Sequence, residues 1–231
     1  MDYRKPAVFG ENWSPSRYKV LPYFTAERAV LARSDISRIL EIGCGNGWNM
    51  SRFAQQGRLA YGLDAVPERA ALAAAHGPAL LADGLRLPFA DNSLDLIYIQ
   101  HVLHHIGDPQ MALAEVRRAL RPGGVLFLVE TVEDNPIIHW GRRLYQKWLG
   151  DEINAPFSFA GLAMMLSDGG FRVQQAGQYS VLFWLWEVLP DQIPALEKLT
   201  PAAVVVEQAL QRVARHYSAH CYLVAVKEPF V

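Results

Sequence analysis

A glycine-rich turn between a strand and a helix constrains the fold of this chain more than any other feature. Residues 39–42 form an apolar run interrupted by Glu41, and Gly43, Gly45 and Gly47 follow it. Apolar residues then recur at helical spacing, so the segment predicts a strand, a tight turn and a helix. Glycine permits backbone angles that side chains forbid and lets a ligand lie directly on the backbone. The free N–H groups that open the helix would attract the anionic or polar end of a nucleotide-like ligand.

Trp48 separates two interpretations of this turn. A dinucleotide-binding fingerprint requires its third glycine at this position, where helix and strand pack closely. A bulky indole cannot replace that glycine, so binding of NAD or FAD is disfavoured. Strand-turn-helix units with glycine turns also occur for purely structural reasons, so the turn alone does not establish a ligand site.

Acidic residues follow the next two predicted strands. Asp64 ends the strand 59–63, about 20 residues after the glycine turn, which is where a βαβ unit places a carboxylate on a ribose diol. The alternative role for Asp64 is an N-cap for the helix that begins at Pro67. Asp83 ends a short strand at 79–82, and its alternative is a solvated turn residue. Because acidic residues recur at successive strand ends, we favour a binding site.

Further motifs carry a resemblance to a known family. Residues 87–97 read LPFADNSLDLI, residues 121–124 read RPGG, and the glycine turn has the form E-x-G-x-G-x-G. Together they resemble class I S-adenosylmethionine (SAM) dependent methyltransferases of the small-molecule, ubiquinone/menaquinone biosynthesis type (methyltransferase type 11). The resemblance covers residues 39–130 well and is weaker beyond them. It implies an α/β, Rossmann-like sheet of seven strands, mostly parallel with an antiparallel last strand, with SAM across the carboxyl ends of the first four strands.

The resemblance also implies roles for individual residues. The three glycines admit the methionine end of SAM, Glu41 orients its ammonium group and Asp64 holds the ribose. Asp83 and the N–H of Leu85 meet the adenine, and Gln100 lies near the sulfonium. The full predicted cofactor-binding set is Tyr18, Glu41, Gly43, Cys44, Gly45, Gly47, Asp64, Ala65, Asp83, Gly84, Leu85 and Gln100.

Three histidines, His101, His104 and His105, follow the predicted strand 96–100. The spacing of His101 and His105 resembles that of helical zinc motifs, but Val102 stands where such a motif has its glutamate, and no third ligand is evident. We therefore expect no metal site. The simpler role is that one histidine caps or packs the loop. His105 or His101 is the candidate catalytic base if the acceptor must lose a proton.

Two absent motifs restrict the chemistry of the acceptor. The residues after the predicted fourth strand, Gln100 to Leu103, are not the Asn-Pro-Pro-aromatic tetrad of amino-base methylation, and no cysteine is placed for carbon-5 chemistry. In-line positioning, worth ~7–11 kcal/mol, is the main requirement of methyl transfer. We predict transfer to an oxygen, nitrogen or carbon atom of a small, largely apolar or aromatic acceptor. A SAM-binding protein without transfer activity, with a regulatory or assembly role, would share every cofactor residue.

Composition restricts the partners and the location. The formal net charge is −1, so no basic excess exists to neutralise phosphates, and nucleic acid is not the expected substrate. Cys44 and Cys221 lie far apart without metal spacing, which predicts a reduced, cytoplasmic environment. Residues 1–10 lack an apolar core of the signal-peptide type and no apolar run approaches the ~20 residues of a membrane span, so we expect neither a leader nor a membrane span.

The length of 231 residues suits one α/β domain with insertions. The predicted parts are an N-terminal lid or helical segment (1–37), the SAM-binding core (38–130), two helical cap insertions (131–156 and 182–217) and the C-terminal part of the core sheet (157–181 and 218–231). The N-terminal segment, with a helix at 25–33, folds over the cofactor or covers the sheet edge. The second insertion carries a helix that begins at Thr200-Pro201. The apolar faces of the insertions form a substrate cap, a homodimer interface or a second core.

Overall fold

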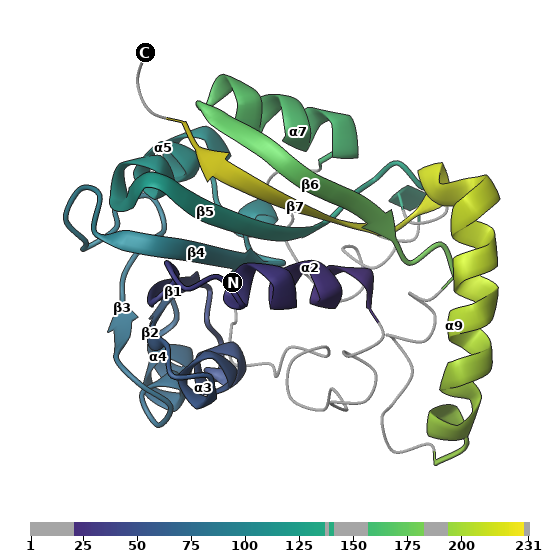
Figure 1. Cartoon of the computed structure of the whole chain (residues 1–231), viewed down its shortest axis with the longest axis horizontal. Helices are drawn as coiled ribbons and strands as arrows, with labels where there is room; N and C mark the ends of the chain where they lie inside the picture. Colours follow the sequence, from purple (N-terminus) through teal and green to yellow (C-terminus); the bar gives the residue numbers. More distant parts are fainter. Residues whose placement is uncertain (1–20, 137–138, 141–156, 183–193, 229–231) are drawn as a thin grey trace.

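The computed structural model describes residues 21–136, 139–140, 157–182 and 194–228. A seven-stranded sheet lies between two layers of helices (Figure 1). The strands are β1 (Arg38–Ile42), β2 (Leu59–Asp64), β3 (Ala79–Leu81), β4 (Leu94–Gln100), β5 (Leu120–Thr131), β6 (Phe171–Tyr179) and β7 (His220–Lys227). Their order across the sheet is β3-β2-β1-β4-β5-β7-β6, with β1 to β5 pairing in parallel and β7 antiparallel to both neighbours. The predicted Rossmann-like sheet with an antiparallel last strand is confirmed.

The helices divide between the two faces of this sheet. They are α2 (Pro22–Leu31), α3 (Trp48–Gln55), α4 (Pro67–Ala73), α5 (Pro109–Ala119), α7 (Phe159–Asp168) and α9 (Pro194–Ala214), with 3-10 turns η1 (Leu103–His105) and η2 (Arg215–Tyr217). One buried cluster joins α5 and α7 to the sheet, and a second joins α2, α3 and α4 to its other face. None of the helices in these residues is both long and apolar enough to cross a bilayer.

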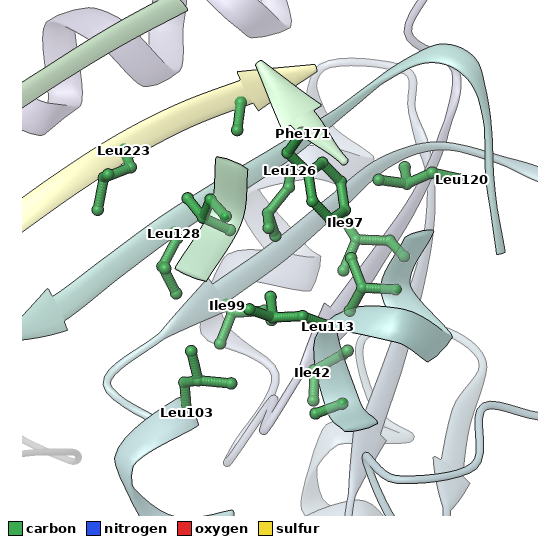
Figure 2. Close-up of a cluster of buried hydrophobic side chains, with 14 of the residues drawn as sticks. Ile42, Ile97, Ile99, Leu103, Leu113, Leu120, Leu126, Leu128, Phe171 and Leu223 are labelled. Atoms are coloured by element: carbon green, nitrogen blue, oxygen red, sulfur yellow. The ribbon is translucent and has the colours of Figure 1, made fainter. Parts of the chain in front are cut away.

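The central strands are apolar on both faces, which is why their sequences are continuous apolar runs. In β4, Ile97 and Ile99 belong to the cluster under α5 and α7, whereas Leu96 and Tyr98 belong to the cluster under α2 and α3. Figure 2 shows the first cluster, where side chains of β4 and β5 meet Leu113 of α5. Because both faces of these strands are buried, the strands are held in register. Their carboxyl ends therefore form one edge of the sheet, where the polar candidate residues lie.

Local sequence signals explain several helix boundaries. Gly57 follows α3 with φ +74°, the left-handed conformation that ends helices. The Asp108 side chain accepts a 2.9 Å hydrogen bond from Met111 N at the start of α5, and Pro109 occupies the first turn. The Ser158 hydroxyl accepts from Gly161 N at 3.0 Å at the start of α7. α5 thus begins where an N-cap aspartate and a first-turn proline coincide.

The N-terminal helix α2 begins at Pro22, earlier than the predicted residue 25, because proline is favoured in a first turn. It packs on the face of the sheet that also carries α3, and the ring centroids of Tyr23 and Tyr179 lie 5.6 Å apart. Tyr18 lies outside the described residues. The role of residues 1–37 as a lid stays a prediction.

The prediction that Thr200-Pro201 begins the last helix was wrong. α9 begins at Pro194, and Pro201 lies inside it. Both prolines suit a first helical turn, and the residues between them continue the helix, so the earlier one starts it. Glu207 of α9 accepts hydrogen bonds from Val181 N at 2.7 Å and Leu182 N at 2.9 Å, which ties α9 to the chain just after β6.

The predicted use of the insertions is open. Most of residues 131–156 and the tryptophans Trp184 and Trp186 lie outside the described residues, and Trp140 is exposed. The exposed apolar side chains of α9 include Leu199, Val205, Val206 and Val213. A substrate cap and a homodimer interface therefore both remain predictions.

Candidate functional site

The glycine turn after β1 has the close packing that its sequence predicts. Gly43, Gly45 and Gly47 all have positive φ, at +71°, +55° and +81°. A Cβ on Gly43 would overlap the side chain of Val102, and a Cβ on Gly47 would lie 2.9 Å from Cα of Ala73 in α4. A Cβ on Gly45 would meet nothing within 4 Å. Gly45 therefore leaves open space beside the backbone, as a bound ligand requires.

Trp48 is the first residue of α3, and Gly47 is the N-cap of this helix. Gly47 also makes a close approach to α4. The Trp48 ring lies 4.5 Å from the guanidinium carbon of Arg52. The turn is therefore built on Gly47, which agrees with the E-x-G-x-G-x-G form of the motif.

Glu41 on β1 is a buried carboxyl group with one oxygen bonded and one unsatisfied. Its side chain is 4% exposed, and Oε1 accepts a 2.7 Å hydrogen bond from Asn49 Nδ2. Oε2 is buried without a hydrogen-bond partner among the described residues. Burial raises the pKa of Glu41 to about 8. A buried carboxylate oxygen without a hydrogen-bond partner raises the free energy of the folded protein. Binding of a ligand that offers a cationic hydrogen-bond donor to Oε2 would remove this cost.

Asp64, at the end of β2, is not the N-cap of α4. That position is Val66, with no side-chain cap. The Asp64 carboxylate is buried and bridges two loops, because Oδ2 accepts from Gly45 N and Oδ1 accepts from Val66 N, both at 2.9 Å. A carboxylate has about four acceptor positions, so capacity for a ribose diol remains. Ala65, next to it, is exposed.

Asp83 and Leu85 lie in the turn after β3. Asp83 is exposed, and its Oδ1 accepts a 2.9 Å hydrogen bond from Leu85 N. The predicted contact of Leu85 N with adenine therefore requires that this internal bond be exchanged. Gly84 between them is buried, and a Cβ on it would lie 3.1 Å from Ile106 Cδ1. Both adenine contacts stay predictions.

Gln100 ends β4 and connects α3 to α2. Its Oε1 accepts from Asn49 Nδ2 at 3.1 Å, and its Nε2 donates to the Tyr23 hydroxyl at 3.2 Å. Cys44 in the turn is buried, and burial raises the pKa of its thiol to about 12, so it is a neutral, inert group there.

His104, which neither base prediction named, contacts a buried carboxylate. His104 Nδ1 lies 2.6 Å from Glu130 Oε2, and both side chains are buried. His101 has φ +53°, and its Nδ1 lies 3.2 Å from Thr131 Oγ1. His105 is exposed on η1. The structure thus separates His104, as a structural residue of the loop, from His101 and His105.

Glu130, at the end of β5, organises the loop after β4. It is fully buried and accepts from Val102 N at 3.1 Å, Leu103 N at 2.7 Å and Thr131 N at 3.1 Å, besides His104. Burial opposes its ionisation, but the neighbouring His104 and these donors outweigh burial and lower the pKa of Glu130 to about 2. Across the described ranges, no group of three or more His, Cys, Asp or Glu side chains could hold a metal ion.

Comparison with known proteins agrees with this geometry. Residues 40–128 match a family described as "Methyltransferase domain". Residues 40–128 are therefore a methyltransferase domain, and the fold is that of class I SAM-dependent methyltransferases. A crystal structure of an S-adenosylmethionine dependent methyltransferase from Mesorhizobium loti resembles it with a TM-score of 0.64 at 21% identity, over 88% of this chain and 97% of that one. The cofactor of this class is SAM, and Glu41, Gly45 and Asp64 fit it.

Two curated relatives of the methyltransferase domain illustrate how far the likeness extends. An uncharacterized 37.1 kDa protein in transposon TN4556 of Streptomyces fradiae is 32% identical over 81% of this chain and 59% of its own length. A demethylmenaquinone methyltransferase of Corynebacterium urealyticum is 31% identical over 54% of this chain and 53% of its own length. The chain spans about half the length of the curated relatives it matches.

Sequence reasoning missed the polar side chains that hold this site together. Asn49 and Arg52 of α3, and Glu27 of α2, lie behind the glycine turn, and Arg52 Nη1 donates to Asn49 Oδ1 at 2.6 Å. One sequence feature could have indicated this role. Asn49 and Arg52 are polar residues three positions apart in a helix whose apolar side packs on the sheet. Glu130 had a similar signal, a carboxylate at the end of an otherwise apolar strand.

Proposed function

We propose that this protein is a SAM-dependent methyltransferase whose acceptor is a small, largely apolar or aromatic molecule. The observation that carries the proposal is the edge formed by β1, β2 and the glycine turn. There the free Oε2 of buried Glu41, the open space at Gly45 and the carboxylate of Asp64 lie on adjacent segments. The Glu41 oxygen suits the ammonium group of SAM, and the Asp64 carboxylate suits its ribose diol. The space at Gly45 would let the cofactor lie against the main chain.

The acceptor side of the proposal rests on a row of rings beyond β4. Successive ring centroids lie 5.6 Å apart for Tyr23 and Tyr179, 5.5 Å for Tyr179 and His220, and 5.0 Å for His220 and His101. Tyr23 and Tyr179 are buried in the core, whereas His101 and His220 are partly exposed, so the accessible end of the row suits contact with an apolar or aromatic molecule. The likeness to proteins named demethylmenaquinone methyltransferase supports an acceptor with this character.

Bound SAM would supply a methyl group that is already activated on a sulfonium, so the chain's own residues act mainly by orientation. Glu41 would hold the ammonium group of the cofactor and Asp64 its ribose, and Gln100, at the end of β4, shares the Asn49 amide with Glu41. Where an acceptor must lose a proton, His101 is the better candidate base, because it lies in the row of rings and has a strained backbone. His105, which is exposed, is the weaker candidate.

The pH dependence of cofactor affinity tests the role of Glu41. A group with a pKa of about 8 is mostly protonated at pH 7, and only its ionised form pairs with an ammonium ion. The affinity for S-adenosylhomocysteine (SAH), measured by calorimetry, is therefore expected to fall about fivefold from pH 8 to pH 7. Glu41→Gln should bind SAH more weakly at pH 8 and show little change over this interval. Equal slopes for both proteins would contradict the assignment.

Calorimetry with SAM and SAH, followed by a search for turnover, tests the proposed function. We expect micromolar or tighter binding and release of SAH in the presence of small aromatic or apolar acceptors. Binding without turnover on any acceptor would favour a regulatory or assembly role. No heat with either compound would remove the proposal. A cytoplasmic location and the exclusion of nucleic acid as the substrate remain predictions from composition.

A further inference from the structure

A buried polar chain connects α2 to the glycine turn. Glu27 of α2 is 1% exposed and forms an ion pair with Arg52 of α3, and Tyr98 donates its hydroxyl to the second Glu27 oxygen at 3.3 Å. Arg52 Nη1 donates to Asn49 Oδ1 at 2.6 Å. Asn49 Nδ2 then donates to Glu41 at 2.7 Å and to Gln100 at 3.1 Å.

Arg52 determines which group donates and which accepts in each hydrogen bond of this buried polar chain. A guanidinium can only donate, so the oxygen of the Asn49 amide must face Arg52. The amide nitrogen of Asn49 is therefore the group that meets Glu41 and Gln100. Because Gln100 uses its oxygen for Asn49, its own nitrogen is left to donate to the Tyr23 hydroxyl, at 3.2 Å. One cation thus orients two amides, and a helix outside the glycine turn holds that cation.

The same chain determines which Glu41 oxygen is available. Asn49 occupies Oε1, and Oε2 is the oxygen without a partner. Arg52 itself is held from two further sides, since its guanidinium carbon lies 4.5 Å from the Trp48 ring and 4.7 Å from the Phe24 ring. These contacts restrict the rotamers of Arg52 and, through it, of Asn49.

We propose that Asn49 is a positioning residue that holds Glu41 for the ammonium group of SAM, and that Arg52 and Glu27 hold Asn49, so that α2 contributes to cofactor affinity. The proposal rests on the proposed function. A purely structural role is the competing explanation: the chain would then anchor α2 on α3, and its loss would weaken every ligand alike. The two explanations differ for a ligand that lacks the ammonium group.

The experiment compares SAH with 5′-methylthioadenosine, which keeps the nucleoside and lacks the amino-acid end. In Asn49→Ala, the dissociation constant for SAH is expected to rise about tenfold or more, because a hydrogen bond to a buried charged group is lost. The constant for 5′-methylthioadenosine should change less than about twofold, since no ammonium group is involved. Glu27→Gln keeps the shape of the side chain and should act in the same direction with a smaller effect.

Exposed residues on the same helices supply the controls. Gln55→Ala, at the end of α3, and Arg28→Gln, beside Glu27 on α2, should leave both constants unchanged. If Asn49→Ala does not fold, Glu27→Gln carries the same comparison. An equal loss for SAH and 5′-methylthioadenosine in a folded variant would overturn the positioning role and leave the proposed function intact. Failure of the unmodified protein to bind SAH would instead reject the proposed function.

Discussion

Replacement of Asp64 by alanine is expected to lower the affinity for SAM and SAH by roughly 100-fold or more, since charge-assisted hydrogen bonds are worth about 1.5–3 kcal/mol each. Two effects add. The variant loses the carboxylate proposed to hold the ribose diol. It also loses the two internal bonds, to Gly45 N and Val66 N, that join the glycine turn to the loop after β2. Titration calorimetry with SAH measures the change.

Two further variants separate these effects. Asp64→Asn keeps the size and one acceptor oxygen, so the turn should persist while the charge is lost, and an intermediate affinity is expected. Glu68→Gln changes an exposed acidic residue in the first turn of α4 and should bind as the unmodified protein does. If Asp64→Ala folds normally and binds SAH with unchanged affinity, the ribose assignment is wrong.

Glu130→Ala is expected to reduce the free energy of unfolding at pH 7 by about 3–5 kcal/mol, because a buried carboxylate is removed and the donors bonded to it are left buried and unpaired. The variant strands the buried imidazole of His104 and frees three backbone N–H groups of the loop after β4 and of β5. Chemical denaturation monitors the change. Glu228→Ala removes an exposed glutamate paired with Arg172 at the surface and should cost less than about 1 kcal/mol.

The effect of Glu130 should depend on pH with a definite sign. Its pKa is about 2 in the folded protein and 4.5 in its ordinary state. The unfolded chain therefore binds more protons between these values. The stabilisation is fully present above pH 4.5 and is lost as the pH falls toward 2. The difference between the unmodified protein and Glu130→Ala should shrink over that interval. A difference that stays constant down to the acid limit of folding would show that the charge of Glu130 is not the cause.

Several parts of the fold were predictable because their signals are local. The positive φ angles at Gly43, Gly45 and Gly47 are backbone requirements that only glycine satisfies without strain. Asp108 and Pro109 both favour a helix start, and α5 begins there. In α9 a local signal misled: Thr200-Pro201 has the form of a helix start, but the helix begins at Pro194 and runs through Pro201.

The residues of the candidate site likewise include some that local sequence signals predict and others that they do not. The sequence predicted that Glu41, Asp64 and Asp83 collect at one edge, because parallel strands bring the ends of consecutive segments together there. His104 was passed over in favour of His101 and His105, because nothing local distinguishes three neighbouring histidines.

The sequence alone thus determined the order of strands and helices, the glycine turn and the acidic strand ends, all of which follow from backbone geometry and apolar patterning over short stretches. Tertiary structure alone decided which polar groups are partners. Glu27 and Arg52 are 25 positions apart, His104 and Glu130 are 26 apart, and Asn49 and Gln100 are 51 apart. A hydrogen bond between such residues depends on burial and on the direction of each donor, which exist only once the helices have packed on the sheet.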